Sequence, residues 1–420
     1  MTEGDVSRAA WLPRRVLVVG LARSGRAAAL ALARRGVEVV AADRSPHVEA
    51  AERLEDAGVE LHLGSEEESL LSEVELVVKS PGVPGESPLP SAARALSIPI
   101  WSEVELGWRL LGGGHPLVGV TGTNGKTTTT ELLGAIFRAA ARPVEVAGNV
   151  GRPLVDVAET IEPDAWVVCE LSSFQLEDVQ TVACEVAVLL NLEPDHLDRH
   201  GTFEAYRSAK LRIFERARHA VVPRGMELPG IEFAADDPLP AEPLIPGAHN
   251  RENAAAATAA ARAAGIEDGA IAEALRTFAG VPHRLELVRE LRGVRYVNDS
   301  KATNAAAARR GIAAYEAPLH VILGGSVKGE DFTAFARELP ANVRTVHLIG
   351  EATDDLARAL DAAGRDYDRA GDLATALAHA HGAAEPGDVV LLSPACASFD
   401  QFDDFEQRGD VFRRLVQELA

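Results

Sequence analysis

The stretch Leu117-Val-Gly-Val-Thr-Gly-Thr-Asn-Gly-Lys-Thr127 decides the class of fold. Its apolar run at 117–120 predicts a buried strand, and we expect a helix to begin at about Lys126. In a glycine-rich loop between a strand and a helix, backbone N–H groups turn inward on phosphate oxygens, Lys126 adds a positive charge, and the Thr127 hydroxyl can hold Mg²⁺. The strict pattern requires glycine at position 120, where this chain has Val. We therefore predict a phosphate-binding loop, with a plain glycine turn before a capped helix as the alternative.

Short β-branched runs alternate with Ala- and Glu-rich stretches along the rest of the chain. The runs lie at residues 16–19, 37–40, 76–78, 165–170, 186–190, 320–323, 345–349 and 389–392, and a hairpin is expected at 285–298. This alternation is typical of βαβ units with parallel sheets. The chain of 420 residues exceeds the size, roughly 250 to 300 residues, at which one core stops growing. We predict an α/β protein of three domains, at residues 1–100, 101–281 and 282–420.

The composition restricts the partners of the protein. Its 42 Lys and Arg against 63 Asp and Glu give a net charge of −21, which argues against nucleic acid and anionic membranes. Its three cysteines lie far apart, so neither a disulfide framework nor a cysteine metal site is indicated. An apolar run follows Arg14-Arg15 but ends at Gly20, and acidic residues precede it, so we read no secretion signal. We expect a cytoplasmic protein without a membrane span.

The first βα turn contains a possible nucleotide motif. Gly20-Leu-Ala-Arg-Ser-Gly25 is followed by Asp43 at the end of the second strand, as in a dinucleotide fingerprint. Ala22 stands where that fingerprint has its middle glycine, and this replacement makes NAD binding less favourable. A nucleotide at this helix N-terminus and a plain tight turn both remain open, and Ser80-Pro-Gly82 is either a second wall of that site or an ordinary turn.

Three segments after the phosphate loop carry candidate catalytic groups. Glu170 closes a strand and either completes a Mg²⁺ shell or is a surface acid. The run Asn191–Asp198 follows the next strand and places acids beside His196, which favours a functional role over a structural one. Lys210 lies on a helix expected over 203–216, where a solvated lysine is the simpler interpretation.

Further candidates lie toward the C-terminus. His249-Asn250-x-x-Asn253 places two amides on one helical face, suited to reading a base or capping a helix. His283-Arg284 can bring a cation to a phosphate or form a linker salt bridge. The loops Asp299–Asn304 and Gly324–Gly329 each follow a strand and present a lysine, which indicates anion sites. Cys396, in the loop after the last strand, is expected to be a small packed residue rather than a nucleophile.

These runs together resemble the Mur ligases of peptidoglycan synthesis over nearly the whole chain. The phosphate loop and four further motifs match in order and spacing: Glu170-Leu-Ser-Ser-Phe-Gln, Asp195-His-Leu-Asp198, Tyr206-Arg-Ser-Ala-Lys210 and His249-Asn-x-x-Asn253. Three more resemble the branch that adds D-glutamate: Ala147-Gly-Asn-Val-Gly151, Asn298–Asn304 and Ser393–Ser398. The resemblance implies a Rossmann-like N-terminal domain that binds the UDP substrate, a central phosphate-loop ATPase-type domain with a parallel sheet, and a Rossmann-like C-terminal domain that binds the amino acid.

The implied activity is the ATP-dependent ligation of D-glutamate to UDP-N-acetylmuramoyl-L-alanine through an acyl phosphate, with release of ADP and phosphate. A sister Mur-type or folylpolyglutamate-type amide ligase is the alternative, and a nucleotide-binding protein without ligase activity is a third hypothesis. The implied cofactors are ATP and Mg²⁺ at two sites, and we expect a monomer.

The resemblance also assigns roles to residues. Lys126, His196 and Lys210 are expected to be catalytic, with Lys210 carbamylated. An ammonium at about 4 Å from a cation is repelled by about 4 kcal/mol per unit charge at an effective dielectric constant near 20, whereas a carbamate supplies oxygen ligands.

The resemblance implies that the metal ligands are Thr127, Glu170, His196 and Lys210. The ATP contacts are Gly122, Thr123, Asn124, Gly125, Lys126, Thr127, Thr128, Asn250, Asn253, Arg284 and Asp299. The UDP-substrate contacts are Arg23, Ser24, Arg44, Ser45, Gly82, Asn149 and Ser172, and the amino-acid contacts are Lys301, Thr303, Lys328, Ser398 and Phe405. Ser326 stands where the family would have an acid.

Overall fold

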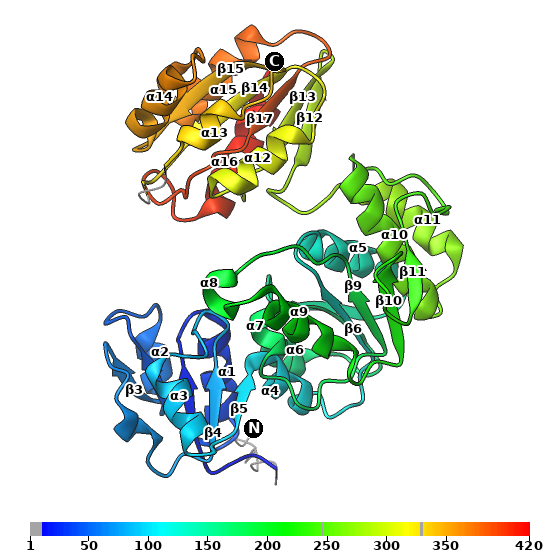
Figure 1. Ribbon diagram of the computed structural model, residues 1–420. Helices are drawn as coiled ribbons and strands as arrows, with labels where there is room; N and C mark the ends of the chain where they lie inside the picture. Colours follow the sequence, from blue (N-terminus) through cyan, green and yellow to red (C-terminus); the bar gives the residue numbers. More distant parts are fainter. Residues whose placement is uncertain (1–10, 246, 328–330) are drawn as a thin grey trace, which may run out of the picture. The chain divides into compact units, whose positions relative to one another are not determined.

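The computed structural model describes residues 11–245, 247–327 and 331–420 (Figure 1). The chain divides into two compact units, the first ending at Phe278 and the second beginning at Ala279. Three parallel or mostly parallel sheets form the cores, two in the first unit and one in the second. Within the described ranges, no helix is long and apolar enough to cross a membrane.

The N-terminal sheet has five parallel strands in the order β3-β2-β1-β4-β5. Its elements are β1 (Arg15–Val19), α1 (Arg23–Ala33), β2 (Glu38–Asp43), α2 (Ala51–Asp56), β3 (Glu60–Leu63), the 3₁₀ turn η1 (Glu68–Leu71), β4 (Leu76–Lys79), α3 (Pro88–Ala95) and β5 (Ile100–Ser102). Strand β1 is central and buried on both faces, which is why its sequence is a continuous apolar run. The short strands β3 and β5 were not predicted, and β5 runs two residues past the expected domain end at residue 100.

The central sheet has six parallel strands in the order β11-β10-β9-β6-β8-β7. Its elements are α4 (Glu103–Leu110), β6 (Leu117–Thr121), α5 (Lys126–Ala139), β7 (Val144–Gly148), α6 (Leu154–Thr160), β8 (Trp166–Glu170), α7 (Ser173–Leu176), β9 (Val186–Leu189), α8 (Leu197–His200), α9 (Phe203–Leu211), the 3₁₀ turn η2 (Arg212–Phe214), β10 (His219–Pro223), β11 (Ile231–Phe233), α10 (Ala248–Ala263) and α11 (Asp268–Thr277). The expectation of one helix over 203–216 is wrong at its end: α9 stops at Leu211, and η2 continues with tighter turns. Helix α10 buries its alanines against α5 and the sheet, as expected of a packed helix.

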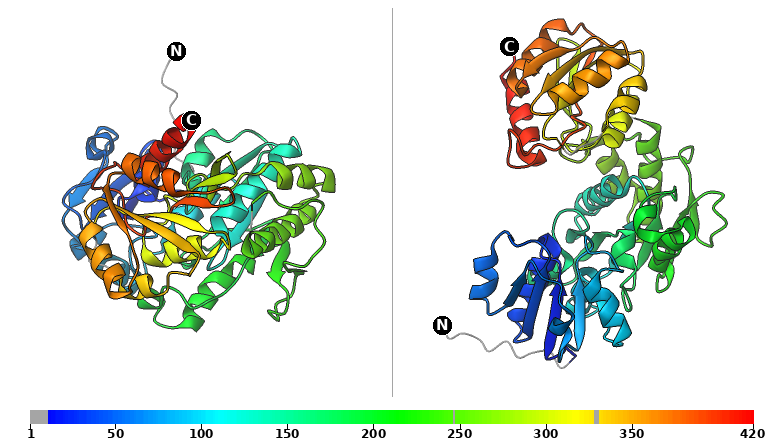
Figure 2. Two further views of the ribbon diagram at one scale, coloured as in Figure 1. Left: turned by 90° about the horizontal axis from the view of Figure 1, so that it is seen from above. Right: turned by 60° about the vertical axis from the view of Figure 1, so that its left-hand side comes forward.

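The sheet of the second unit has six strands in the order β12-β13-β17-β14-β15-β16, and only β12 and β13 pair antiparallel. Its elements are β12 (Glu286–Leu291), β13 (Val294–Asn298), α12 (Ala305–Ala313), β14 (Leu319–Gly324), α13 (Thr333–Arg337), β15 (Val343–Ile349), α14 (Thr353–Ala362), β16 (Asp368–Gly371), α15 (Leu373–Ala383), β17 (Val389–Leu392) and α16 (Phe405–Glu418). The predicted hairpin at 285–298 is confirmed. Helices α12, α13 and α14 cover one face of this sheet, and α15 and α16 cover the other (Figure 2).

The N-terminal and central sheets belong to one unit because their cores are continuous. Leu106 of α4 and Val155 of α6 pack in the same buried cluster as Val16 and Val18 of β1. A buried ion pair adds to this junction, since Lys79 Nζ lies 3.0 Å from Asp178 Oδ2 and both side chains are at most 8% exposed. The N-terminal and central sheets are therefore joined through buried contacts.

Candidate active site

The phosphate loop joins β6 to α5 as the sequence predicts. Gly125 has a φ of +83°, and a Cβ there would lie 2.2 Å from Asn253 Oδ1, so the position requires glycine. Lys126 Nζ donates to the carbonyl oxygens of Gly122 and Thr123, each over 2.9 Å. The ammonium group thus lies over the loop at the N-terminus of α5, where backbone N–H groups and the helix dipole favour an anion.

Three residues from other segments hold this loop in place. The Asn124 N–H donates to Asn191 Oδ1 over 2.8 Å, and Asn191 Nδ2 donates to the Asn124 carbonyl over 3.2 Å. Asn124 Nδ2 also donates to Glu193 Oε2, and the Tyr206 hydroxyl lies 2.9 Å from Thr123 Oγ1. The run Asn191–Asp198 was predicted to be functional, but these bracing roles of Asn191, Glu193 and Tyr206 were not foreseen.

Glu170 provides a buried carboxylate beside the loop. It ends β8, which pairs with β6, and is 2% exposed, so the alternative of a surface acid is wrong. Asn149 Nδ2 donates to Oε1 over 3.0 Å, whereas Oε2 is buried and has no hydrogen-bond partner among the described residues. A buried carboxylate oxygen without a donor is costly unless a cation reaches it, so Glu170 fits a Mg²⁺ ligand. Thr127, in the first turn of α5, is also buried.

Lys210 is a buried lysine under the phosphate loop. It is 2% exposed, and its Nζ donates to the Gly122 carbonyl oxygen over 2.7 Å. The alternative of a solvated helix lysine is therefore wrong. Burial, helped by the nearby charge of Lys126, lowers the pKa of the Lys210 amine from 10.5 to about 7, while Asp195 and Glu170 act in the opposite direction. These four charged groups thus share one site.

His196 lies at the entrance to α8 and is half-exposed. Its backbone has a φ of +52°, its Nε2 lies 3.5 Å from Asp195 Oδ2, and its ring packs on Phe174 with centroids 5.0 Å apart. The imidazole is therefore held but accessible, as a metal ligand requires. Phe174 and its neighbour Arg199, whose guanidinium lies 4.0 Å over the Phe174 ring, were not predicted.

The two amides predicted to contact ATP, Asn250 and Asn253, lie on α10. Asn253 is buried against Gly125 of the phosphate loop, and its Nδ2 donates to Asn250 Oδ1 over 3.4 Å. Both amides therefore belong to the phosphate-loop site, and neither residue is the N-cap of the helix, which is Gly247.

The first βα turn is organised by its own residues. The Leu21 and Ser45 N–H groups donate to the two oxygens of Asp43, and Ser80 Oγ donates to the Gly20 carbonyl over 2.7 Å. Asp43 and Ser80 therefore stabilise the turn. Arg23 Nη1 donates to the Gly151 carbonyl over 3.0 Å, which links this turn to the loop of Asn149.

The remaining UDP-substrate candidates lie around this region. Ser24 is half-buried near the start of α1, Arg44 is exposed beyond β2, and Gly82 faces open space. Ser172 is the N-cap of α7, where Gln175 completes a capping box. Its hydroxyl is thus already used in the fold.

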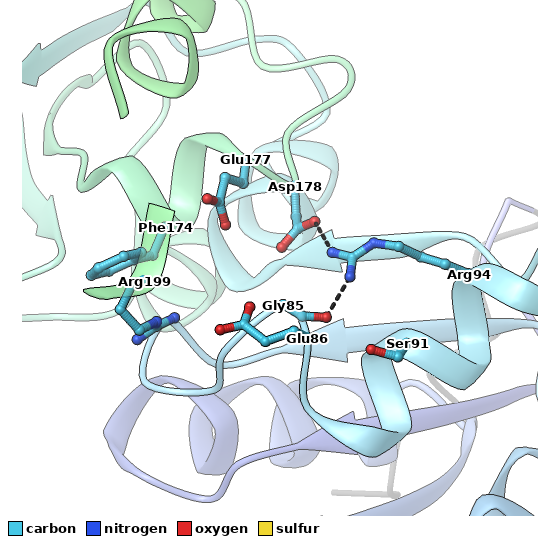
Figure 3. Close-up of a pocket in the computed structure, with 8 residues that line it drawn as sticks. All are labelled: Gly85, Glu86, Ser91, Arg94, Phe174, Glu177, Asp178 and Arg199. Carbon is cyan, nitrogen blue, oxygen red and sulfur yellow. Dashed lines mark hydrogen bonds and ion pairs between the residues drawn. The ribbon is translucent and has the colours of Figure 1, made fainter. Parts of the chain in front are cut away.

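A pocket of about 590 Å³ lies between the N-terminal and central sheets of the first unit (Figure 3). Arg94 links the Gly85 carbonyl to Asp178 on one side, and Arg199 lies on the other, donating to the Pro81 and Val83 carbonyls. Among the described residues, none of those predicted to contact the UDP substrate lines this pocket.

In the second unit, three loops at the carboxyl ends of β13, β14 and β17 converge on Arg408 of α16. Its side chain is fully buried and donates to the carbonyl oxygens of Ser300, Cys396 and Ala397 over 2.9 to 3.1 Å, and to Ser300 Oγ. Burial lowers its pKa to about 10, so it remains a cation at neutral pH. Arg408 was not predicted, although it holds together the loops that carry the amino-acid candidates.

The amino-acid candidates surround these loops. Lys301 Nζ lies 5.6 Å from the Phe405 ring, Thr303 precedes the N-cap of α12, Ser398 is buried, and Phe405 begins α16. Lys328 lies outside the described residues. Ser326 braces the loop after β17: its N–H donates to the Ala397 carbonyl, and its Oγ accepts from the Phe399 N–H.

Asp299 and Arg284 lie at the start of this unit. Asp299 is 5% exposed, with Oδ2 accepting from Ser393 Oγ over 2.7 Å and Oδ1 accepting from the Leu285 N–H. Burial raises the pKa of Asp299 to about 7. Its carboxylate is therefore enclosed by its own domain, whereas Arg284 is only half-buried. Cys396 is buried, as expected of a packed residue.

A glycine-rich loop on a central strand of a parallel sheet, with a carboxylate on the adjacent strand, is typical of phosphate-loop nucleotide-binding proteins. Three family models refine this class: the N-terminal domain of MurD-like Mur ligases at residues 14–102, the Mur ligase middle domain at 120–229, and the Mur ligase glutamate ligase domain at 283–396.

Relatives match over nearly the full chain. Two proteins named UDP-N-acetylmuramoylalanine–D-glutamate ligase are each 41% identical to this chain. The match to the one from Acidobacterium capsulatum covers 96% of both chains. The match to the one from Pelotomaculum thermopropionicum covers 97% of this chain and 98% of the relative. The Salinibacter ruber protein of that name is 39% identical over the whole of both chains. The chain therefore belongs to the Mur ligase family, in the branch of these D-glutamate ligases.

Solved structures support the fold. The UDP-N-acetylmuramate-alanine ligase of Thermotoga maritima is 20% identical with a TM-score of 0.58, over 96% of this chain and 99% of its own. The MurF ligase of the same organism, in complex with ADP, is 17% identical over the whole of both chains, with a TM-score of 0.58. The predicted three-domain α/β fold, with Rossmann-like terminal domains and a central phosphate-loop domain, is confirmed.

Proposed function

We propose that this protein joins D-glutamate to UDP-N-acetylmuramoyl-L-alanine with the hydrolysis of ATP to ADP and phosphate, as a step of cell-wall peptidoglycan synthesis. The proposal rests on the full-length similarity to ligases of that name and on the buried amine of Lys210, 2.7 Å from the phosphate loop. In this reaction, the substrate carboxylate attacks the γ-phosphorus of ATP, and the bond from phosphorus to the ADP oxygen breaks. The D-glutamate amine then attacks the acyl carbon, phosphate leaves, and a proton is lost from nitrogen.

The phosphate loop binds and orients ATP. Lys126 and the loop N–H groups hold the phosphates, while Asn250 and Asn253 take the nucleoside. Because each substrate is an anion, positive groups must offset the charge that develops during phosphoryl transfer. Because the protein as a whole has a net charge of −21, the anionic substrates must be attracted by these local cations.

Mg²⁺ would be held by Thr127 and Glu170 at one site and by His196 and Lys210 at a second. When bound, it supplies the positive charge that neutralises the phosphate oxygens. The unpartnered Oε2 of Glu170 supports the first site. Asn149 orients the Glu170 carboxylate from the other side.

The low pKa of Lys210 supports its proposed carbamylation. Only a neutral amine attacks CO₂; the new N–C bond gives a carbamate anion, and one proton is released. An amine with a pKa of about 7 is largely neutral in a cell, whereas an ordinary lysine is almost wholly protonated. Lys210 is therefore suited to this modification.

The D-glutamate carboxylates would be received in the second unit, near the N-termini of α12 and α16. Thr303, Ser398 and the Phe405 N–H can donate to them, and Lys301 and Lys328 add charge. The buried cation of Arg408 makes the potential around these loops more positive. These donors favour an acidic amino acid over a neutral or cationic one.

The experiment is phosphate release from ATP with UDP-N-acetylmuramoyl-L-alanine and one amino acid at a time. We expect release with D-glutamate and none above background with L-glutamate, L-lysine or diaminopimelate. Release with L-lysine or diaminopimelate but not with D-glutamate would make the protein a sister ligase. ATP hydrolysis that no amino acid stimulates would indicate a nucleotide-binding protein without ligase activity.

A further inference from the structure

A cluster of two histidines and one aspartate lies on the second unit and includes none of the amino-acid candidates. It consists of His347 of β15, Asp368 of β16 and His379 of α15, whose ligand atoms all lie within 4.8 Å of one another. His347 and Asp368 are register partners on adjacent strands, and α15 packs on the same two strands. Three separate elements of secondary structure thus bring one ligand atom each to the same point.

We propose that this cluster binds a divalent transition-metal ion, Zn²⁺ being the probe of choice, through His347 Nδ1, His379 Nδ1 and Asp368 Oδ2. The site is independent of the proposed ligase function. Its role would be to fasten the edge strand β16 and helix α15 to β15.

The separation between the ligand atoms of β15 and β16 suits a metal. His347 Nδ1 lies 3.3 Å from Asp368 Oδ2. Two ligand atoms bound to Zn²⁺ at about 2.0 to 2.1 Å in tetrahedral geometry lie about 3.3 Å apart. His379 Nδ1 forms a short contact with the same carboxylate oxygen, so both imidazoles are directed at Asp368. Two imidazole nitrogens and one carboxylate favour Zn²⁺ and its neighbours over Mg²⁺, which prefers oxygen ligands.

A hydrogen-bonded chain fixes the orientation of the His347 ring. His347 Nε2 lies 2.9 Å from Thr345 Oγ1, and Thr345 Oγ1 lies 2.8 Å from His320 Nδ1. His320 Nε2 lies 3.1 Å from Asp388 Oδ2. Such support of the second ring nitrogen is typical of histidines that bind metals.

Both imidazole rings of this chain are buried, since His320 and His347 are 1% and 4% exposed. Their hydrogen bonds with Thr345 and Asp388 hold the rings in place, so that Nδ1 of His347 is directed at Asp368 Oδ2, 3.3 Å away.

The cluster is accessible from solvent. The side chains of His379 and Asp368 are 50% and 41% exposed, so an ion has a path to the site and water can occupy a fourth position. The same exposure means that substitutions at these two residues leave the core of the unit unchanged.

The test measures the affinity of the full chain for Zn²⁺ by competition with a chromophoric zinc chelator. The protein is first stripped of metal with EDTA and is then kept in excess Mg²⁺. His379→Gln and Asp368→Asn should each weaken one Zn²⁺ site by at least about tenfold. His381→Gln, on the same helix, should leave that site unchanged because His381 contacts Tyr296 instead of the cluster. Hydrogen exchange of β16 and α15 amides should slow on addition of Zn²⁺ in the wild type but not in H379Q.

Two outcomes would overturn the proposal. In one, wild type, H379Q and D368N bind Zn²⁺ with equal affinity and stoichiometry. In the other, Zn²⁺ binds without slowing exchange in β16 or α15. Either result would assign the three residues to an ordinary hydrogen-bonded cluster.

Discussion

The amine of Lys210 donates a hydrogen bond to the carbonyl oxygen of Gly122 over 2.7 Å, although the two residues are 88 positions apart in the chain. The contact places a buried amine directly beneath the loop proposed to bind the ATP phosphates. Burial and the Lys126 charge lower its pKa to about 7, which favours the neutral amine that the proposed carbamylation requires.

Lys210→Ala should reduce turnover by at least about 100-fold, the scale for losing one group that stabilises charge in the transition state. Short carboxylic acids such as acetate or propionate should restore part of the activity, because their oxygens can occupy the place of the carbamate. Phosphate release at increasing acid concentration measures this effect.

Arg207→Ala is the matched control for Lys210→Ala, since Arg207 lies on the same helix, is partly exposed and pairs with Glu204. Its activity should stay within about twofold, as expected of a surface ion pair. Full activity of Lys210→Ala without added acid would exclude the carbamate.

Glu170→Gln should raise the Mg²⁺ concentration needed for half-maximal activity by about tenfold or more, because the amide keeps the hydrogen bond from Asn149 but loses the negative charge. Mg²⁺ titration of phosphate release at saturating ATP measures the shift. Glu162→Gln, an exposed change just before β8, is the control. An unchanged Mg²⁺ requirement in Glu170→Gln would remove Glu170 from the metal site.

The sequence predicted those parts of the site that depend on short spacing. The phosphate loop, Glu170 at the end of its strand and the two amides of α10 lie where the pattern places them. Asn191 and Arg408 could not be found in this way, because the contact of Asn191 with Asn124 spans 67 positions and that of Arg408 with Ser300 spans 108. A single arginine on an amphipathic helix also looks like a surface charge. The burial of Lys210 was missed for the same reason: helical periodicity did not reveal that this face of α9 lies against the phosphate loop.

Arg408→Met should destabilise the second unit by about 3 kcal/mol, because the carbonyl oxygens of Ser300, Cys396 and Ala397 each lose a charged donor. Loosening these loops should also raise the KM for D-glutamate more than it changes the KM for ATP. Urea unfolding and steady-state kinetics measure the two effects, and Arg414→Met, an exposed change on the same helix, is the control. An unchanged KM for D-glutamate in a folded variant would limit Arg408 to a structural role.

The raised pKa of Asp299 gives the second unit a pH-dependent stability. Since the pKa is about 7 in the folded state and about 3.9 in the unfolded state, the folded state binds the extra proton between these values. Stability therefore falls as pH rises from about 4 to 7, by up to about 4 kcal/mol. Asp299→Asn should remove this contribution. The unfolding free energy of the variant minus that of the wild type should therefore increase from pH 5 to pH 8. Asp366→Asn, an exposed acid of the same unit, should show no such trend, and parallel curves for wild type and Asp299→Asn would contradict the raised pKa.

Gly125→Ala tests whether the close approach between Gly125 and Asn253 is required for ATP binding. The new Cβ would lie 2.2 Å from Asn253 Oδ1, so either the loop or the amide must move, and both belong to the proposed nucleotide site. ATP affinity should fall by at least about tenfold, a loss of about 1.4 kcal/mol, while the fold persists because the loop lies at the surface of its domain. Gly113→Ala separates steric contact from backbone strain, since Gly113 has a φ of +73° but no atom within 4 Å of its added Cβ. Gly113→Ala should cost stability of about 1 kcal/mol without changing ATP affinity, as measured by calorimetric titration. If Gly125→Ala bound ATP as tightly as wild type, Asn253 could not be in contact with the loop when the nucleotide is bound.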